Sequence, residues 1–225
     1  MWRGHNREHI FADNCEKLDY LEQVGAGRKE QTKEMVHWYS FCIMGNHTHE
    51  TGGIQLDENK KSFLPGIREL GNWMRRAHSR FGAGYNRRHQ RQGKVACDRP
   101  KTCEIENEYQ VLRVMFYGDA NPVRAGIVSH PSRYAFSSYQ YYAHGKKSSV
   151  TRHLTPPKAY LELGKTSTER QRKYRQHCDQ YLREAGLIND EPSKEMEARV
   201  IGNGLWCLAR SAAAREAYNE RAGPA

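Results

Sequence analysis

The chain has 225 residues, with 36 lysines and arginines against 26 aspartates and glutamates, and a formal net charge of +10. This length is enough to bury a core, and one domain with an appendage is expected. No apolar run is long enough to span a bilayer, and the opening MWRGHNREH lacks the apolar segment of a secretory signal. We therefore expect neither a membrane-spanning nor a secreted protein. The excess of positive charge indicates a polyanionic partner, either nucleic acid or an anionic membrane surface.

The six cysteines are scattered along the sequence without a close CxxC pair. In a chain without a secretion signal we expect them to be reduced thiols. A zinc site that uses Cys97 and Cys103 is an alternative, although their spacing matches no common zinc module.

The first quarter of the chain predicts two strands around one helix. REHIF, residues 7–11, predicts a short strand, and residues 12–25 predict a helix that begins with a capping box of Asp13 and Glu16. Three apolar side chains are expected on the buried side of this helix: Leu18, Leu21 and Val24. MVHWYSFCIM, residues 35–44, is rich in β-branched and aromatic residues and predicts the second strand.

The next segments alternate between extended and helical patterns. HETGGIQL, residues 49–56, predicts a glycine-marked turn into another strand or extended segment. Residues 62–85 predict a long helix with apolar side chains three and four positions apart: Ile67, Leu70, Met74, Ala77 and Phe81. KTCEIE, residues 101–106, predicts a short strand. A second helix is expected after the cap Asn107, and Pro122 must end it soon.

The character of the sequence changes after about Ala143. A polar connection with prolines leads to a capping box of Thr166 and Glu169, which predicts a charged helix over 167–186. The remainder, to Ala225, predicts a helical tail. We therefore expect a first domain over 1–145 and a linker with a helical tail over 146–225. Short strands separated by helices predict the α+β class.

Two histidines stand one residue apart at the end of an apolar run. On a strand, alternate side chains share a face, so His47 and His49 point the same way. Two adjacent imidazoles are suited to holding a metal ion. The alternative is a pair of solvent-facing histidines at the end of a strand.

A second group lies on the helix before Pro122. Arg113, Tyr117 and Asn121 recur every four residues and therefore line one helical face. The neighbouring side of the helix is apolar and can anchor that face to a sheet: Leu112, Met115 and Phe116. Taken singly, Tyr117 could be an ordinary surface residue and Asn121 an ordinary helix-ending residue.

The segment from Trp73 to Lys94 is strongly basic, with no acidic residue between Glu69 and Asp98. Its cations alternate with aromatic side chains and are candidates for nucleic-acid contacts: Arg75, Arg76, Arg80, Arg87, Arg88, Arg91 and Lys94. This pattern favours a surface for a phosphate backbone over a merely solvated helix face.

Together these features resemble a known family. MGNHTH, YGDANPVRAGIV and YAFSSY, with RGHNREHIF and YNRRHQRQG, are similar to motifs of the HUH-type single-tyrosine transposases, specifically the REP-associated tyrosine transposases of bacteria. The resemblance covers residues 1–142. It implies a ferredoxin-like (RRM-like) antiparallel sheet with the histidine pair on a central strand and the tyrosine on a helix packed beside it. His47 and His49 match the pair, Tyr117 the nucleophile, and Asn121 the third metal ligand.

The resemblance also implies an activity and its setting. It predicts a metal-dependent single-stranded DNA endonuclease and strand transferase that acts on REP-type hairpin DNA with Mg²⁺ or Mn²⁺. Tyr117 would form a 5′-phosphotyrosine link, with nearby arginines such as Arg113 favouring the phenolate. Arg113 and Arg124 join the predicted DNA contacts. The expected location is the bacterial cytoplasm at the nucleoid, without a membrane, as a monomer or a homodimer.

Three other functions compete with this one. The first is a DNA-binding protein that descends from the same family and is catalytically weak. The second is a metallohydrolase of the amidohydrolase type, which also begins with His-x-His but needs a longer barrel and further histidines. The third is an RRM-type RNA-binding module, although the aromatic RNP pattern is not evident in the sequence.

Overall fold

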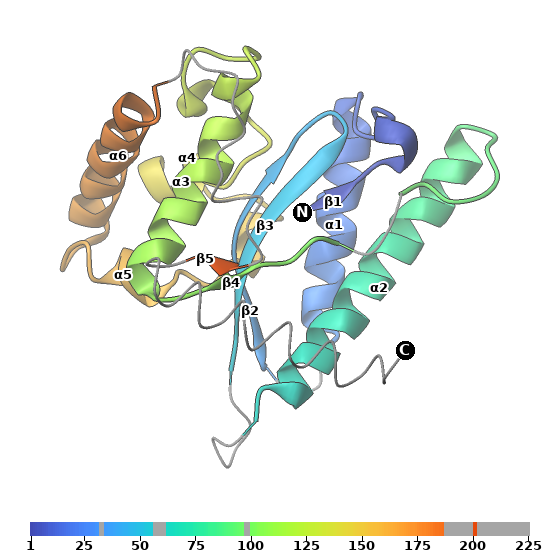
Figure 1. Cartoon of the computed structure of the whole chain (residues 1–225), viewed down its shortest axis with the longest axis horizontal. Helices are drawn as coiled ribbons and strands as arrows, with labels where there is room; N and C mark the ends of the chain where they lie inside the picture. The colour runs from blue at the N-terminus through green and yellow to red at the C-terminus, as the bar shows by residue number, and fades with distance from the viewer. Residues whose placement is uncertain (32–33, 56–61, 97–99, 187–199, 202–225) are drawn as a thin grey trace, which may run out of the picture.

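The computed structural model describes residues 1–31, 34–55, 62–96, 100–186 and 200–201 (Figure 1). The chain folds into an α+β structure, as predicted, around an antiparallel sheet of three strands in the order β1-β3-β2. These strands are β1 (Trp2–Arg3), β2 (Val36–Ile43) and β3 (His47–Ile54). The strand that carries the histidine pair is therefore the central one.

Helices cover both faces of the sheet (Figure 1). The described residues contain α1 (Asn14–Lys29), α2 (Leu64–Arg88), α3 (Glu108–Arg124), α4 (Tyr139–His144), α5 (Lys158–Leu161) and α6 (Ser167–Glu184), with the short 3₁₀ turns η1 (His5–Arg7), η2 (Pro131–Arg133) and η3 (Thr151–His153). Alternate residues of β3 contact the two layers. Glu50 accepts a hydrogen bond from Tyr20 of α1, and His49 lies against Tyr117 of α3.

The first strand lies earlier in the chain than predicted. Trp2 pairs with Thr48 and Arg3 pairs with His47, whereas residues 7–11 form no strand. Ile10 and Phe11 are nevertheless fully buried, because they pack into the core after η1. The apolar pair in REHIF is a signal of burial and not of extended backbone.

Both edges of the sheet are bordered by further extended backbone. Beside β2, Ile43 N donates to Phe136 O and Ser138 N donates to Phe41 O, each at 2.9 Å. Beside β1, Gly4 forms an isolated antiparallel bridge with Ala96. A separate parallel pair joins β4 (Glu104–Ile105), within the predicted strand over 101–106, to β5 (Val200–Ile201).

The glycines of HETGGIQL do not form the predicted turn, because Gly52 and Gly53 lie within β3. A Cβ on Gly52 would lie 2.5 Å from the carbonyl oxygen of His37, and one on Gly53 would clash with the hydroxyl of Tyr39. These glycines therefore permit the close approach of β2, which is irregular between Trp38 and Ser40.

Helices α1 and α2 pack together on one face of the sheet, and most of the side chains predicted to be buried in them are buried or pack against the core. In α1, Leu21 and Val24 are buried as predicted, but Leu18 is 49% exposed. Asp13 stands at the N-cap without a side-chain capping bond, so the predicted capping box is wrong. The Glu16 carboxylate accepts hydrogen bonds from Arg88 instead. In α2, Ala77 and Phe81 are buried and Leu70 and Met74 pack against the core, whereas Ile67 is 52% exposed.

The helices on the other face begin at their predicted caps. Asn107 accepts a hydrogen bond from Gln110 N at the start of α3, and Thr166 accepts one from Glu169 N at the start of α6. Helix α3 continues through Pro122 and ends at Arg124. The core runs across the predicted boundary at residue 145, with contributions that include Tyr160 and Tyr174. The predicted tail after residue 186 lies outside the described residues apart from β5.

Candidate active site

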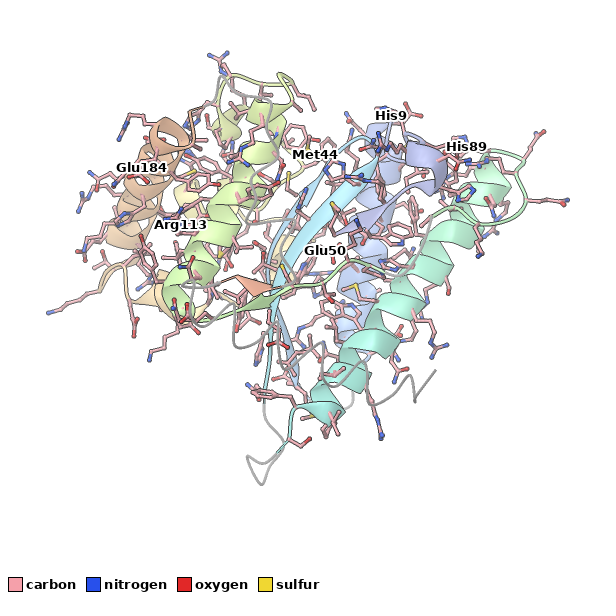
Figure 2. All side chains as sticks on the ribbon, viewed as in Figure 1. His9, Met44, Glu50, His89, Arg113 and Glu184 are labelled. Atoms are coloured by element: carbon pink, nitrogen blue, oxygen red, sulfur yellow. The ribbon has the colours of Figure 1, made fainter. Side chains whose placement is uncertain are left out.

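His47 and His49 lie side by side on the face of β3 that α3 covers. Their ring centroids are 4.9 Å apart, with an angle of 79° between the ring planes. His47 is the first residue of β3 and follows the turn after Met44. Figure 2 labels Met44 near the upper end of the sheet. In that turn Met44 N donates to His47 O at 2.8 Å.

Both imidazoles are neutral at physiological pH. Burial lowers the pKa of His47 to about 4, and the positive charges of Arg3 and the N-terminal amine add to the effect. Burial, followed by the neighbouring His47, holds the pKa of His49 well below its usual range. A neutral imidazole is the form that binds a metal ion, so neither ring has to lose a proton first.

The orientation of the pair also suits metal binding. Nδ1 of His47 lies 2.6 Å from Oδ1 of Asn46. The amide oxygen only accepts, so Nδ1 carries the proton and the lone pair is on Nε2. Nδ1 of His49 is buried and has no hydrogen-bond partner among the described residues. A buried nitrogen of this kind requires an explanation, and a ligand that the chain itself does not supply is one.

Tyr117 of α3 meets this pair from the other layer. Its ring centroid is 5.6 Å from that of His49, with an interplanar angle of 70°. The structure thus brings together a strand and a helix that are far apart in the sequence. The contact exists because apolar residues such as Leu112 and Met115 bury the neighbouring side of α3 in the core.

Asn121 follows Tyr117 by one helical turn. Its Nδ2 donates to the carbonyl oxygens of Tyr117, at 2.9 Å, and Gly118, at 3.5 Å. The amide oxygen is the atom that a hard divalent cation would use. The described residues contain no cluster of three or more His, Cys, Asp or Glu side chains able to hold a metal. Within the described residues, therefore, His47 and His49 are not joined by a third His, Cys, Asp or Glu side chain in a metal-binding group.

Arg124, a cation that the sequence placed among the DNA contacts, lies over the ring of Tyr117. Arg124 Cζ lies 4.5 Å from the centroid of the Tyr117 ring, and the guanidinium donates a 2.9 Å hydrogen bond to the hydroxyl of Tyr181. Arg113 lies further back along α3, where Figure 2 labels it. Tyr181 belongs to α6, beyond residues 1–142 over which the sequence resembles the transposases, so no sequence signal linked it to Tyr117.

Two further residues near the site were not singled out from the sequence. Asn46 orients His47, and Arg3 lies opposite His47 in the β1–β3 ladder. Both lie within recognisable motifs, Asn46 in GNHTH and Arg3 in RGHNR, and that position is the signal that could have identified them. Asp119, close to Tyr117 in sequence, is buried on the α6 side, where it accepts a 2.7 Å hydrogen bond from the hydroxyl of Tyr174.

The basic segment is not the acid-free surface that its sequence predicts, because other elements supply carboxylates. Arg76 and Arg80 pair with Glu30 of the segment after α1. Arg88 pairs with two carboxylates of α1, at distances of 2.6 and 2.7 Å. Arg91 pairs with Glu8 at 2.7 Å. Three of the predicted cations form no ion pair within the part of the chain that the structure describes: Arg75, Arg87 and Lys94. Helix α2 lies on the opposite side of the sheet from α3, the helix that carries Tyr117 (Figure 1).

Cys15, Cys42, Cys103 and Cys178 are free thiols, and Cys97, needed for the alternative zinc site, lies outside the described residues. Among the helices that the structure describes, none has the length and apolar character to cross a membrane.

No protein-family model, curated protein or solved structure matches the chain.

Proposed function

We propose that the chain is a metal-dependent single-stranded DNA endonuclease and strand transferase that uses Tyr117 as its nucleophile on REP-type hairpin DNA. The observation that carries the proposal is the contact of Tyr117 with His49, which itself lies beside His47; sequence motifs selected these three residues independently of any structure. Its partner is single-stranded or hairpin DNA, and its place is the bacterial cytoplasm.

The element order supports a ferredoxin-like fold. The chain runs β1-α1-β2-β3-α2, with α1 and α2 packed together, and then reaches Ala96, which bridges Gly4 at the outer edge of β1. With that bridge counted as a fourth strand, the order across the sheet is the fourth, first, third and second. Tyr117 approaches from α3 on the opposite face.

Tyr117 supplies the attacking oxygen in this reaction. The phenolate attacks the scissile phosphorus in line, the bond from phosphorus to the 3′ oxygen breaks, and a free 3′-hydroxyl leaves. The resulting 5′-phosphotyrosine keeps the bond energy, so a later 3′-hydroxyl can reverse the step without ATP. A phenol with a pKa of about 10 is a weak nucleophile at neutral pH. The guanidinium of Arg124 beside the ring favours the phenolate and the incoming phosphate.

The divalent ion, Mg²⁺ or Mn²⁺, would be held by His47, His49 and Asn121. When bound, it supplies polarisation of the phosphoryl group. The residues of the chain fit this task because both imidazoles are neutral and Asn46 orients one of them.

A second candidate is a DNA-binding protein with little catalytic activity. Gly118 favours it, because a glycine directly after the nucleophile loosens helix α3 and nothing lies within 4 Å of where its Cβ would stand. The two candidates differ in one observable property, which is a covalent link between protein and DNA.

The test is an adduct assay with a labelled single-stranded hairpin oligonucleotide and Mn²⁺, resolved on a denaturing gel. Wild type should form a covalent adduct that is lost in Tyr117→Phe, which removes one oxygen and keeps the ring. Tyr109→Phe is the matched control, because Tyr109 is on the same helix and 66% exposed. An adduct that persists in Tyr117→Phe would assign the nucleophile to another residue. No adduct in wild type would favour the second candidate.

The same assay with a chelator and with added Mn²⁺ tests the requirement for a metal ion. Chelation should abolish the adduct, and Mn²⁺ should restore it in wild type but not in the double variant His47→Ala, His49→Ala, because one amide cannot hold the ion alone. Full adduct formation in excess chelator would exclude a metal at this site.

A further inference from the structure

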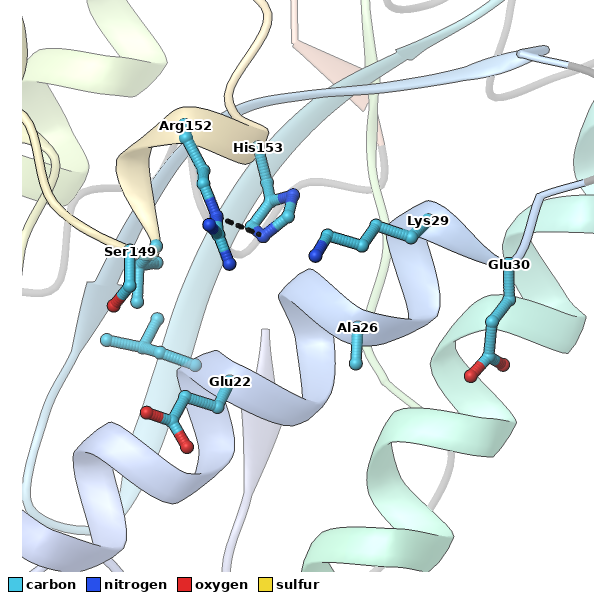
Figure 3. A pocket seen from close by; sticks show the side chains of 9 residues that line it. Glu22, Ala26, Lys29, Glu30, Ser149, Arg152 and His153 are labelled. Carbon is cyan, nitrogen blue, oxygen red and sulfur yellow. Dashed lines mark hydrogen bonds between the residues drawn. The ribbon is translucent and has the colours of Figure 1, made fainter.

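A pocket of about 470 Å³ lies between α1 and the short turn η3, apart from the Tyr117 site (Figure 3). Helix α1 contributes Leu21, Ala26 and Lys29, and the η3 region contributes Ser149, Arg152 and His153. The family motifs end at residue 142, so half of this pocket is built from chain that they do not cover.

Cationic side chains converge on the pocket from both elements. Figure 3 shows Lys29 reaching from α1 toward His153, and Arg152 beside His153 on the opposite wall. Arg152 Nε donates a 3.3 Å hydrogen bond to His153 Nε2. Neither Lys29 nor Arg152 forms an ion pair with any residue that the structure describes. Two positive charges are therefore held at one opening without a carboxylate between them.

His153 responds to this concentration of charge. Its pKa is lowered by burial first, and then by the positive charges of Arg152, Lys29 and Arg28. Three cations thus act on one imidazole, and such a field attracts an anion.

The carboxylates at the rim do not cancel this charge. Glu30 is engaged by α2, where Arg80 forms two hydrogen bonds to it of 2.7 and 3.1 Å and Arg76 adds a third contact at 3.3 Å. Glu22 lies with Ser149 on the side of the opening away from Lys29 (Figure 3). The pocket therefore has a cationic side and a side with hydrogen-bonding oxygens.

The position of His153 depends on a glycine beneath it. A Cβ on Gly25 would lie 2.7 Å from Cδ2 of His153. Helix α1 carries a glycine at the point where the imidazole rests on it, although glycine weakens a helix interior by about 1 kcal/mol.

We propose that this pocket binds the phosphate group of a nucleotide, with Lys29 and Arg152 holding the charge. A free phosphate ion would fill only a small part of the cavity, whereas pockets of about 300–1,000 Å³ accommodate small organic ligands. Glu22 and Ser149 offer acceptors for the hydroxyl groups of the sugar. The nucleotide is either free or one unit of a strand. The proposal does not depend on the chemistry of Tyr117.

Calorimetric titration of the full chain at low salt tests the proposal with a nucleoside 5′-monophosphate, the same nucleoside without phosphate, and inorganic phosphate. The monophosphate should bind most tightly and the nucleoside should not bind. Arg152→Gln and Lys29→Gln should each weaken the binding roughly tenfold, because each removes a charge-assisted hydrogen bond. Arg172→Gln, which removes an exposed charge from α6, should leave it unchanged.

Equal binding of the nucleoside, equal weakening by all three substitutions, or no binding of the monophosphate at millimolar concentration would each overturn the proposal. Titration with a single-stranded oligonucleotide shows whether the ligand is a free nucleotide or one unit of a nucleic-acid strand. If it binds more tightly than the monophosphate and with the same sensitivity to Arg152→Gln, the ligand is a unit of a strand. If only the monophosphate binds, the ligand is a free nucleotide. The readout is binding in the absence of cleavage, so it is separate from the adduct assay.

Discussion

Arg124 stands between two tyrosines: its guanidinium donates a 2.9 Å hydrogen bond to the hydroxyl of Tyr181 while lying 4.5 Å from the centroid of Tyr117. Helix α6 is therefore linked to the proposed catalytic site through the hydrogen bond between Tyr181 and Arg124. A second polar link joins the same two helices, because Tyr174 of α6 donates to Asp119 of α3 at 2.7 Å. The helix that carries the proposed nucleophile is thus held by a segment outside residues 1–142, over which the sequence resembles the transposases.

The first prediction concerns the link through Tyr181. Tyr181→Phe removes the acceptor of Arg124 and keeps the ring, so the guanidinium loses one of its restraints. We expect the rate of adduct formation in single-turnover assays to fall about fivefold, as for the loss of a hydrogen bond of about 1 kcal/mol. The affinity for DNA should change little. A rate equal to that of Tyr109→Phe and wild type would show that Tyr181 does not position Arg124.

The second prediction concerns the buried Asp119. Burial raises the pKa of this carboxyl group to about 7, although hydrogen bonds from Tyr174 and Ser137 oppose the rise. In the unfolded chain an aspartate ionises near a pKa of about 3.9. Between these values the folded state binds more protons, so the free energy of unfolding contributed by Asp119 falls as the pH rises from about 4 to 7. Asp119→Asn should remove this fall and be more stable than wild type at pH 8, as measured by urea unfolding at pH 5 and pH 8. Parallel pH profiles for both proteins would contradict the assignment.

The third prediction separates two neighbouring arginines. Arg88 binds Glu16, which is 3% exposed, whereas Arg87 forms no ion pair within the described residues. Arg88→Gln removes the guanidinium from the buried Glu16 carboxylate, which among the described residues keeps only its 2.8 Å contact with His89 Nε2, and we expect the free energy of unfolding to fall by about 2 kcal/mol. Arg87→Gln should change it by less than about 0.5 kcal/mol. Denaturant unfolding measures the free energy of unfolding of both variants. Equal decreases would show that the ion pair between Arg88 and Glu16 does not stabilise the fold.

The fourth prediction concerns Gly118, directly after the proposed nucleophile. Nothing lies within 4 Å of a Cβ built there, so Gly118→Ala should raise the free energy of unfolding by about 0.5–1 kcal/mol through helix propensity. Gly27→Ala is the contrasting variant, because its Cβ would meet the ring of Trp73 and should lower stability. Thermal unfolding of both distinguishes open space from close packing. A loss of stability in Gly118→Ala would indicate a structural need for glycine at that position.

The sequence predicted most of the helices and strands because apolar spacing and capping residues within a segment depend on that segment alone. The apolar spacing of residues 62–85 located α2, and the caps Asn107 and Thr166 located the starts of α3 and α6. The two-residue strand β1 has no periodicity of its own. Its conformation comes from pairing with β3, which no local pattern records.

The side-chain partners could not be predicted for the same reason. The sequence correctly showed that the segment after Glu69 lacks acidic residues, but the partners of Arg80 and Arg88 come from α1 and the residue after it. Likewise, Arg113 and Arg124 both share a helix with Tyr117, and only the packing of α6 placed Arg124 over the ring. The histidine pair was predictable because two residues of one strand need no tertiary information to share a face.

The borders of the sheet have a consequence for how the protein associates. Beside β2, the carbonyl of Trp38 accepts from Thr155 N at 2.7 Å and that of Phe41 from Ser138 N, while Val95 O, beside β1, accepts from His5 N at 3.0 Å. Unpaired strand edges are the templates on which chains join into continuous sheets and aggregates. With these backbone groups already occupied, the fold leaves little of its sheet edge for another chain to extend. Along the sheet edges that the structure describes, concentrated protein should accordingly resist edge-to-edge aggregation.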